Sequence, residues 1–209
     1  MTFVQRSTGS TDASPEDDFW ALRGKAIQEY AMLEHSLFNM FYRLAGMDMK
    51  SAGVIFFRVV STRARNAMIE DLYRQKFGDE MNLFRNSLLR MLRCLDEDRN
   101  KIVHWCAVLH QELGPRGIVR EFRLEKPQYW DFNENSPYYT REHIGHFISR
   151  CHFLCRVCYM FAMLMIPAPT SAHSDIHQDD ERAWRDIFQQ PIVYPPPDSH
   201  PIFRTLREP

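Results

Sequence analysis

Apolar residues recur every three or four positions between residues 19 and 44, and this spacing predicts one long amphipathic helix. Ser14 and Pro15, followed by acidic residues at 16–18, are typical of a helix start, and Gly46 is typical of a helix end. We expect the apolar positions to face the core. They are Phe19, Leu22, Ala26, Tyr30, Leu33, Leu37, Phe41 and Leu44.

Further helical patterns follow along the chain. Residues 51–57 are too apolar for a loop and predict one or two buried helical turns. Residues 61–78, which begin with a Ser cap and end with Gly, predict a second helix, and residues 79–105 predict a third. Residues 140–165 predict a fourth helix, which a proline ends. Successive helices with short links predict an antiparallel bundle.

The periodicity changes from helical to alternating after residue 105. Residues 106–113 and 118–124 flank a Gly-Pro-Arg-Gly turn and predict a β-hairpin, although Arg120 interrupts the apolar face of the second arm. Residues 127–137 predict a loop rich in aromatic residues. The fold class that we expect is all-α: an antiparallel four- to five-helix bundle with a small hairpin at about residues 106–124 and a Pro-rich C-terminal tail.

The composition of the two ends differs from that of the middle. We expect a flexible N-terminus at 1–13, one helical domain at 14–166 and a Pro-rich extended tail at 167–209, with a helical turn or two around 179–188. The tail is either loose or packed over a partner surface. Its apolar residues are Ile192, Val193, Tyr194, Ile202 and Phe203.

The overall charge gives no general attraction to nucleic acid, because the net charge of the 209 residues is −1. An RNA site must therefore be a local patch, and residues 58–93 carry eight basic residues against four acidic ones. An Arg-rich, solvated helix face explains that stretch equally well. The basic residues are Arg58, Arg63, Arg65, Arg74, Lys76, Arg85, Arg90 and Arg93.

The remaining composition favours a cytoplasmic protein without a membrane partner. The five cysteines are an odd number and indicate no disulfide framework. The N-terminus lacks the apolar core of a signal peptide, and the longest apolar run, at 157–166, is too short to span a bilayer. No Gly-rich phosphate loop occurs, so nothing indicates a P-loop or dinucleotide enzyme.

The candidate catalytic residues are Arg99, Asn100 and His104, at the end of the third predicted helix. Asn100 and His104 are four residues apart and share a helix face, so Asn100 can orient the His104 ring. Arg99 lies on a different face of this predicted helix, the face that Leu88, Leu92 and Leu95 turn towards the core. A histidine can transfer the proton of a ribose 2′-hydroxyl or of the leaving oxygen, and an arginine can stabilise charge on phosphate. This combination suits RNA cleavage without a metal, especially where two copies meet across a two-fold axis.

The same spacing recurs at Arg141 and His146, so the spacing alone does not identify a site. The first copy has Asn after the arginine and closes a long helix, whereas the second has Glu there and opens a helix. A structural alternative for the first copy is an ion pair of Arg99 with Asp96, or with another acid, beside an ordinary helix-terminal histidine.

The sequence Arg99-Asn100-x-x-x-His104 resembles the signature of the HEPN superfamily, in which an arginine and a polar residue precede a histidine. The helix order of residues 19–105 is also similar in outline to bacterial HEPN-type proteins. The resemblance implies a dimeric helical bundle in which the motifs of both protomers line one cleft. In active members that cleft is a metal-independent endoribonuclease.

The resulting expectation is an endoribonuclease in which Arg99 binds the phosphate, Asn100 orients either Arg99 or His104, and His104 is the general acid and base. We expect RNA contacts from Arg85, Arg90, Arg93 and Lys101, and no cofactor. The expected partners are RNA, a second copy of the chain and an antitoxin or other protein. The alternative is a non-catalytic module that binds RNA, a nucleotide or a protein.

A zinc site on the last predicted helix is a further alternative. Cys151, Cys155 and Cys158 share one helix face, and His152 is next to them. Three ligands on one rigid helix rarely converge tetrahedrally, and free cysteine packs well as a small apolar residue. The sequence therefore predicts no metal.

Overall fold

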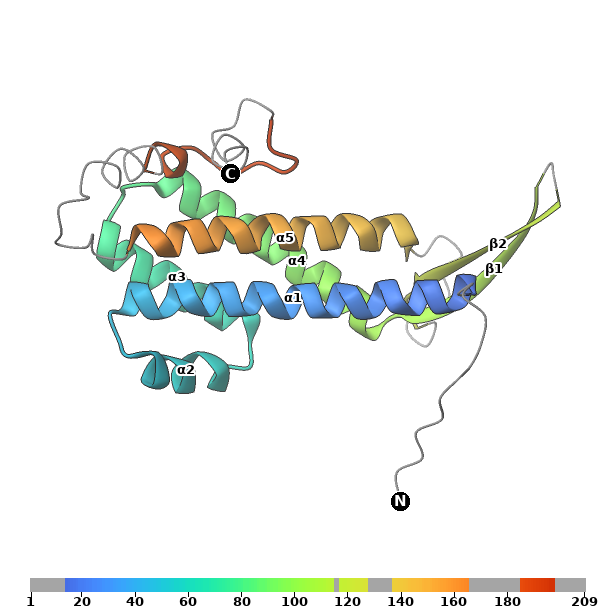
Figure 1. Ribbon diagram of the computed structural model, residues 1–209, viewed down its shortest axis with the longest axis horizontal. Coiled ribbons are helices and arrows are strands. Elements are labelled where there is room, and N and C mark those ends of the chain that lie inside the picture. The colour runs from blue at the N-terminus through green and yellow to red at the C-terminus, as the bar shows by residue number, and fades with distance from the viewer. Residues whose placement is uncertain (1–13, 115–116, 128–136, 166–184, 198–209) are drawn as a thin grey trace, which may run out of the picture.

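The computed structural model describes residues 14–114, 117–127, 137–165 and 185–197 (Figure 1). The described chain is mostly helical and also contains a small antiparallel sheet. The helices are α1 (Pro15–Ala45), α2 (Met49–Arg58), α3 (Thr62–Phe77), α4 (Asn82–His104) and α5 (Arg141–Leu164), and the strands are β1 (Cys106–Gly114), β2 (Gly117–Glu125) and β3 (Tyr138–Tyr139).

The local signals at the ends of α1 act as the sequence predicts. Ser14 Oγ accepts a hydrogen bond of 3.1 Å from the backbone N–H of Asp17, and the Asp17 side chain completes a capping box. Gly46 ends the helix in the left-handed conformation, with φ of 62°. Residues 51–57 belong to the longer helix α2, in which Ala52 and Phe56 are buried.

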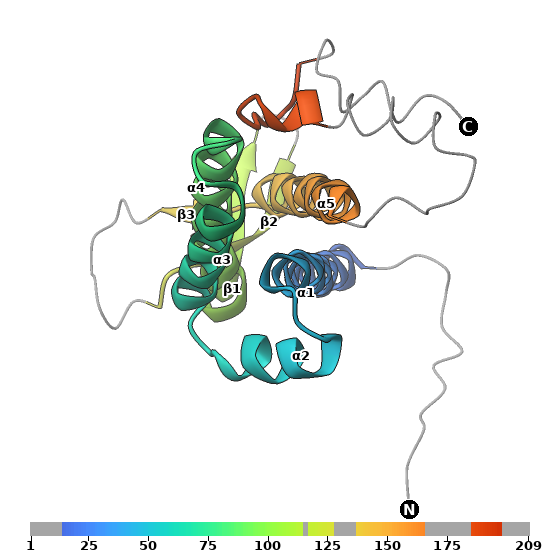
Figure 2. The ribbon, with the colours of Figure 1, turned by 90° about the vertical axis from the view of Figure 1, so that its left-hand side faces the viewer.

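Two layers of helices make up the body of the molecule. Viewed along the bundle, α1 and α5 lie side by side, α3 and α4 form a second layer against them, and α2 lies under α1 (Figure 2). The prediction of an antiparallel bundle is wrong for one pair: α1 and α5 both begin at the hairpin end and run the same way (Figure 1). The reason is that α4 ends beside the hairpin, and the chain enters α5 from there.

The fold is not purely α-helical, because the hairpin gains a third strand. β1 pairs with β2 in register from Cys106↔Glu125 to Gly114↔Gly117, and Leu124 pairs with Tyr139 of β3. The base of the hairpin packs on the bundle, where Phe122 stacks on Phe19 with ring centroids 5.6 Å apart. Its far end projects beyond the helices (Figure 1), so the polar Arg120 is exposed there.

The core of the second layer includes part of the C-terminal segment. Residues 185–188 form a helical turn, and Ile187, Phe188 and Ile192 are buried. The Phe188 ring lies 4.6 Å from Phe84 and 5.2 Å from Phe161, measured between ring centroids. The predicted N-terminus 1–13, residues 128–136 of the predicted aromatic loop, and residues 167–184 and 198–209 of the predicted tail lie outside the described residues.

Among the described helices, α5 is long and apolar enough to cross a membrane by length and composition alone. Half of its most apolar window is buried inside the fold, and core helices of soluble proteins pass the same test.

Candidate functional site

One face of α4 carries a row of exposed polar side chains that ends at His104. Arg90, Arg93, Glu97, Asn100 and His104 are all exposed and follow each other at three- or four-residue spacing. We call these five residues the outer face of α4. At 1.5 Å per residue the row is about 21 Å long. Two of the predicted RNA contacts, Arg90 and Arg93, therefore share a surface with Asn100 and His104.

Arg99 lies at the boundary between α4 and α1 rather than in the core. Its guanidinium carbon is 5.7 Å from the centre of the Tyr30 ring, a cation–π distance. Its Nη1 donates a hydrogen bond of 3.1 Å to Asn100 Oδ1. Within the described residues Arg99 forms no ion pair, and the carboxylate of Asp96 is engaged elsewhere. The buried charged residue of this turn is its neighbour Asp98.

Asn100 contacts the arginine of the motif and not the histidine. Its side-chain oxygen accepts from Arg99, and no hydrogen bond joins it to His104 in the described part of the chain. The His104 side chain is exposed and makes no hydrogen bond or ion pair with any described residue. The expected orientation of the His104 ring by Asn100 is therefore absent from a single protomer.

A residue that the sequence pattern did not reveal holds the end of α4. Arg23 of α1 donates from Nε to the carbonyl of Ile102 (2.8 Å) and from Nη2 to the carbonyls of Val103 (2.9 Å) and Trp105 (3.1 Å). These carbonyls belong to the last helical turn and the residue that follows it, where the helix itself supplies no donors. Burial lowers the pKa of Arg23 from its ordinary value. The only sequence signal is an arginine next to the apolar stripe of the first helix.

Lys101, predicted to contact RNA, belongs to a cluster of charged and polar groups on the inner side of α4. Its Nζ donates to Asp98 Oδ1 at 3.1 Å and lies 4.9 Å from the centre of the Tyr139 ring. Asp98 also accepts hydrogen bonds from the Tyr139 hydroxyl and from Arg150. Burial alone would raise the pKa of Asp98, but these hydrogen bonds and the charge of Arg150 outweigh it and lower the pKa.

Arg85, another predicted RNA contact, is buried. Its exposed fraction is 7%, its Nη1 donates to the Gly78 carbonyl at 3.4 Å, and its guanidinium lies over Tyr73. The side chain packs between α3 and α4 and does not reach the outer face of α4. Other basic residues of the 58–93 stretch are also engaged: Arg65 pairs with Glu34 at 2.8 Å, and Arg74 with Glu70 at 2.6 Å.

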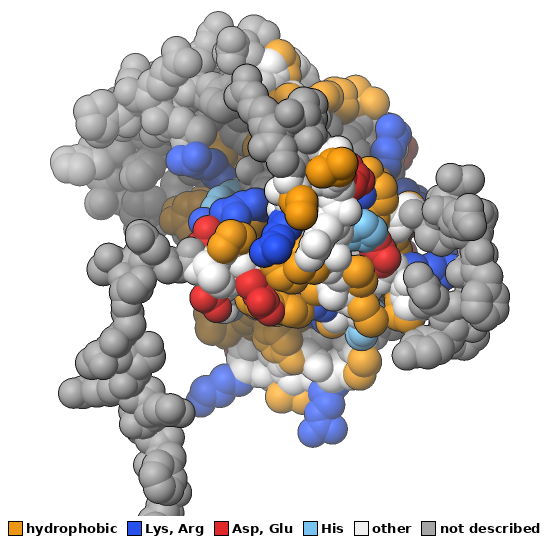
Figure 3. Space-filling view, turned by 90° about the vertical axis from the view of Figure 1, so that its right-hand side faces the viewer, with side chains coloured by type: hydrophobic (Ala, Val, Ile, Leu, Met, Phe, Trp, Pro, Cys, Tyr) orange, Lys and Arg blue, Asp and Glu red, His pale blue; other side chains and the backbone are white. Residues whose placement is uncertain are grey.

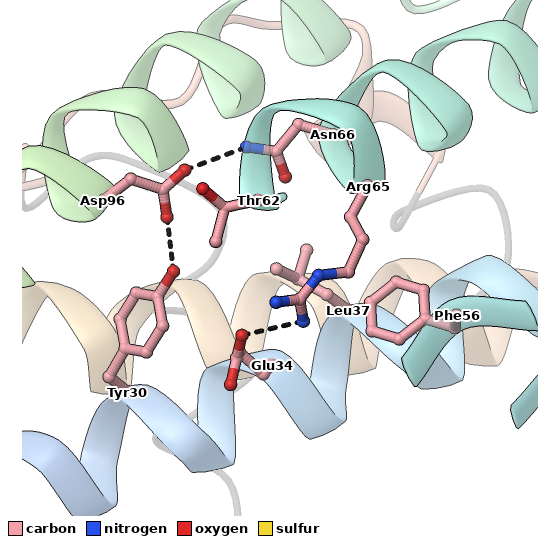
Figure 4. A pocket seen from close by; sticks show the side chains of 8 residues that line it. All are labelled: Tyr30, Glu34, Leu37, Phe56, Thr62, Arg65, Asn66 and Asp96. Carbon is pink, nitrogen blue, oxygen red and sulfur yellow. Dashed lines mark hydrogen bonds and ion pairs between the residues drawn. The ribbon is translucent and has the colours of Figure 1, made fainter. Parts of the chain in front are cut away.

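A small polar hollow lies between α1, α2, α3 and α4 (Figure 4). Asp96 accepts hydrogen bonds from the Tyr30 hydroxyl and from Asn66 Nδ2, and Arg65 reaches Glu34 across the hollow. The space holds about one water molecule, too little for a base or a nucleotide. Burial, followed by the Asp96 carboxylate, raises the pKa of Tyr30, so its hydroxyl remains a donor. The hydrogen bonds in this hollow join Asp96 of α4 to Tyr30 of α1 and Asn66 of α3.

The second Arg–His pair, at the start of α5, is open to solvent. Arg141 lies 3.8 Å from Asp18, and His146 lies 3.7 Å from Glu142, a spacing typical of exposed ion pairs. The cysteine face of α5 also forms no metal cluster within the described residues. Cys151 and Cys158 are buried, and His152 pairs with Glu29 at 2.6 Å.

The surface charge is mixed at the end of the molecule from which the hairpin projects. There, hydrophobic side chains lie between separate basic, acidic and histidine side chains, and the described residues form no continuous basic patch in this view (Figure 3). No family model matches the chain, and no curated protein or solved structure matches it at a significant level.

Proposed function

We propose that this chain is a metal-independent endoribonuclease of HEPN type that acts as a homodimer. One observation carries the proposal: His104 ends an exposed row that also contains Arg90, Arg93 and Asn100, while Arg99 lies directly beside that row. His104, which has no hydrogen-bond or ion-pair partner among the described residues, would then act on the same RNA strand as Arg99, Arg90 and Arg93. The helical bundle supplies the rigid support that such groups need.

The proposed reaction is transesterification of the RNA backbone. An imidazole removes the proton from the ribose 2′-hydroxyl, the 2′-oxygen attacks the adjacent phosphorus, and the bond from phosphorus to the 5′-oxygen breaks. A protonated imidazole gives its proton to that leaving oxygen. The guanidinium of Arg99 stabilises the charge on the phosphoryl oxygens. The products are a 2′,3′-cyclic phosphate and a 5′-hydroxyl.

Two protomers supply the two imidazoles more readily than one. Each chain brings a single His104, whereas the reaction uses a base and an acid. The side of α1 beside the end of α4 offers an apolar surface for a second copy, because Trp20 and Ile27 are 44% and 46% exposed. We propose that this surface forms the two-fold interface and brings both motifs to one cleft.

RNA cleavage in EDTA tests the proposal. Wild-type protein should produce 2′,3′-cyclic phosphate ends, and His104→Ala and Arg99→Ala should each reduce the rate by at least about 100-fold. His146→Ala is the matched control, because it removes the histidine of the second Arg–His pair. Dependence of the activity on added divalent metal, or full activity of His104→Ala, contradicts the proposal.

A second candidate is a non-catalytic HEPN-like module that binds RNA, a nucleotide or a partner protein such as an antitoxin. It is favoured by the contacts of Arg99, which is held by Asn100 and Tyr30 of its own chain. Undiminished RNA affinity without cleavage, unchanged in His104→Ala, would select it. For either function we propose a cytoplasmic location, since all five cysteines are free thiols.

A further inference from the structure

Helix α1 contacts both ends of the Arg99–His104 motif. Arg23 binds the carbonyls at the His104 end, and Tyr30 lies under Arg99. The two residues are seven positions apart, about two helical turns, so they project from the same side of α1. We propose that Arg23 and Tyr30 are positioning residues that fix His104 and Arg99 for RNA cleavage, an inference that rests on the proposed function.

Arg23 supplies hydrogen-bond donors to carbonyls at the C-terminal end of α4, where the helix has no N–H groups left to bind them. His104 is the last residue of α4, and only the Trp105 N–H, bonded to the Lys101 carbonyl at 2.9 Å, continues the helical pattern beyond it. A terminal turn of this kind frays unless its carbonyls are satisfied. Because the two donating nitrogens of Arg23 bind carbonyls on both sides of His104, they fix the backbone from which the imidazole projects.

Tyr30 acts on Arg99 in two ways. Its ring supports the guanidinium, and its hydroxyl donates to Asp96, which lies three residues before Arg99 on α4. Asp96 is bound in turn to Asn66 of α3 at 3.2 Å, so this turn of α4 is fixed to two neighbouring helices (Figure 4). Tyr30 is 6% exposed, and its ring also stacks on Phe147 of α5 with centroids 6.2 Å apart. The guanidinium is thereby restricted to the α1–α4 boundary.

The variants Arg23→Met, Arg23→Lys and Tyr30→Phe separate these effects. Arg23→Met keeps the unbranched aliphatic stem and removes the guanidinium with all three of its hydrogen bonds. Arg23→Lys keeps the charge but replaces the planar fork with a point donor. Tyr30→Phe keeps the ring under Arg99 and removes the bond to Asp96. Lys25→Met is the matched control, since Lys25 is an exposed cation two residues from Arg23 on the same helix.

Amide hydrogen exchange and cleavage kinetics are measured on the same full-length variants, with thermal unfolding as the check on folding. In Arg23→Met we expect the amides of residues 102–105 to exchange about tenfold faster or more, while the middle of α4 is unchanged. We expect kcat to fall by about 10- to 100-fold, while KM stays within a factor of about three of the wild-type value. The reason is that the substitution disturbs the position of His104 but removes no contact with RNA. Arg23→Lys should recover part of both effects, and Lys25→Met should show neither.

Tyr30→Phe should lower kcat by about three- to tenfold and leave exchange at residues 102–105 unchanged, because it acts on the Arg99 end. Unchanged exchange in Arg23→Met, or unchanged kcat in both Arg23→Met and Tyr30→Phe, overturns the inference. The exchange measurement needs no RNA. If wild-type protein cleaves nothing, the proposed function fails on its own, and faster exchange then supports only the claim that Arg23 fixes the position of His104.

Discussion

Arg150 donates a hydrogen bond from Nη2 to Oδ2 of Asp98, and this ion pair joins α5 to α4 one residue before Arg99. Asp98 is 8% exposed, so its charge is withdrawn from water and depends on its partners. Tyr139 and Lys101 supply the other hydrogen bonds. The pair therefore fixes the inner side of the turn whose outer side carries Asn100.

Asp98→Asn should lower the free energy of unfolding by about 3 kcal/mol. The substitution leaves the Arg150 and Lys101 charges without their carboxylate, and an amide supplies one acceptor oxygen in place of two. Urea unfolding at neutral pH measures the change. Glu97→Gln, at the neighbouring exposed position, should stay within about 0.5 kcal/mol of wild type. If Asp98→Asn is as stable as wild type, the hydrogen bonds of Asp98 with Arg150, Tyr139 and Lys101 contribute nothing to the free energy of unfolding.

The same carboxylate makes stability depend on pH. Its pKa in the folded protein lies below the ordinary value of 3.8, so folding is favoured when Asp98 is ionised. The stabilisation is complete above the ordinary value and is lost as the pH falls through the lower, folded-state pKa. The difference in unfolding free energy between wild type and Asp98→Asn should therefore be constant from pH 6 to 7 and shrink below about pH 4. A difference that grows on acidification would contradict this sign.

Local patterns in the sequence predict the elements of the fold well. Ser14 and Gly46 delimit α1, and Thr140 precedes α5, because caps depend on neighbouring residues alone. The direction of α5 relative to α1 was not predicted correctly. It depends on where the hairpin returns the chain, and no periodicity within a helix encodes that position.

The candidate site shows the same limit at the level of side chains. The shared face of Asn100 and His104 follows from helix geometry, and both residues are exposed as that geometry requires. The burial of Arg85 depends on contacts between different helices. The hydrogen bonds from Arg23 to the end of α4 likewise join residues that are far apart in sequence. Likewise, the pattern placed Arg99 towards the core, but the turn buries Asp98 because Arg150 and Tyr139 are there to pair with it.

RNA binding should depend on the outer face of α4. Replacing both Arg90 and Arg93 with Gln should weaken binding and reduce the slope of log affinity against log salt by about 1.4, if each arginine contacts one phosphate of a single strand. Glu97→Gln should strengthen binding, because Glu97 lies between Arg93 and Asn100 on that face. Fluorescence anisotropy with a labelled RNA over a salt series measures both effects. Arg74→Gln, whose arginine pairs with Glu70, is the control, and an equal loss there would argue against a local site.

The cysteines should divide into reactive and protected thiols. Burial raises the pKa of Cys151 to about 12 and also raises that of Cys158, so neither forms a thiolate near neutral pH. Cys94 and Cys106 are exposed. A thiol reagent should label these two quickly in the native protein, and Cys151 and Cys158 only after unfolding. Protection that is lost on addition of a chelator would instead indicate a metal on the cysteine face of α5.

Residues 185–197 of the C-terminal segment, which pack on the bundle, should contribute to the stability of the whole fold. Phe188 is 1% exposed and contacts the aromatic rings of Phe84 in α4 and Phe161 in α5, and the N–H of Ile192 donates to Ser87 Oγ at 2.8 Å. Phe188→Ala should therefore lower the unfolding free energy by about 3–4 kcal/mol, because it leaves a cavity that the rings cannot fill. Val193→Ala, at a position 52% exposed, should change it by less than about 0.5 kcal/mol. Denaturant unfolding followed by intrinsic fluorescence makes the comparison. Equal stability of the two variants would mean that residues 185–197 contribute little to the core.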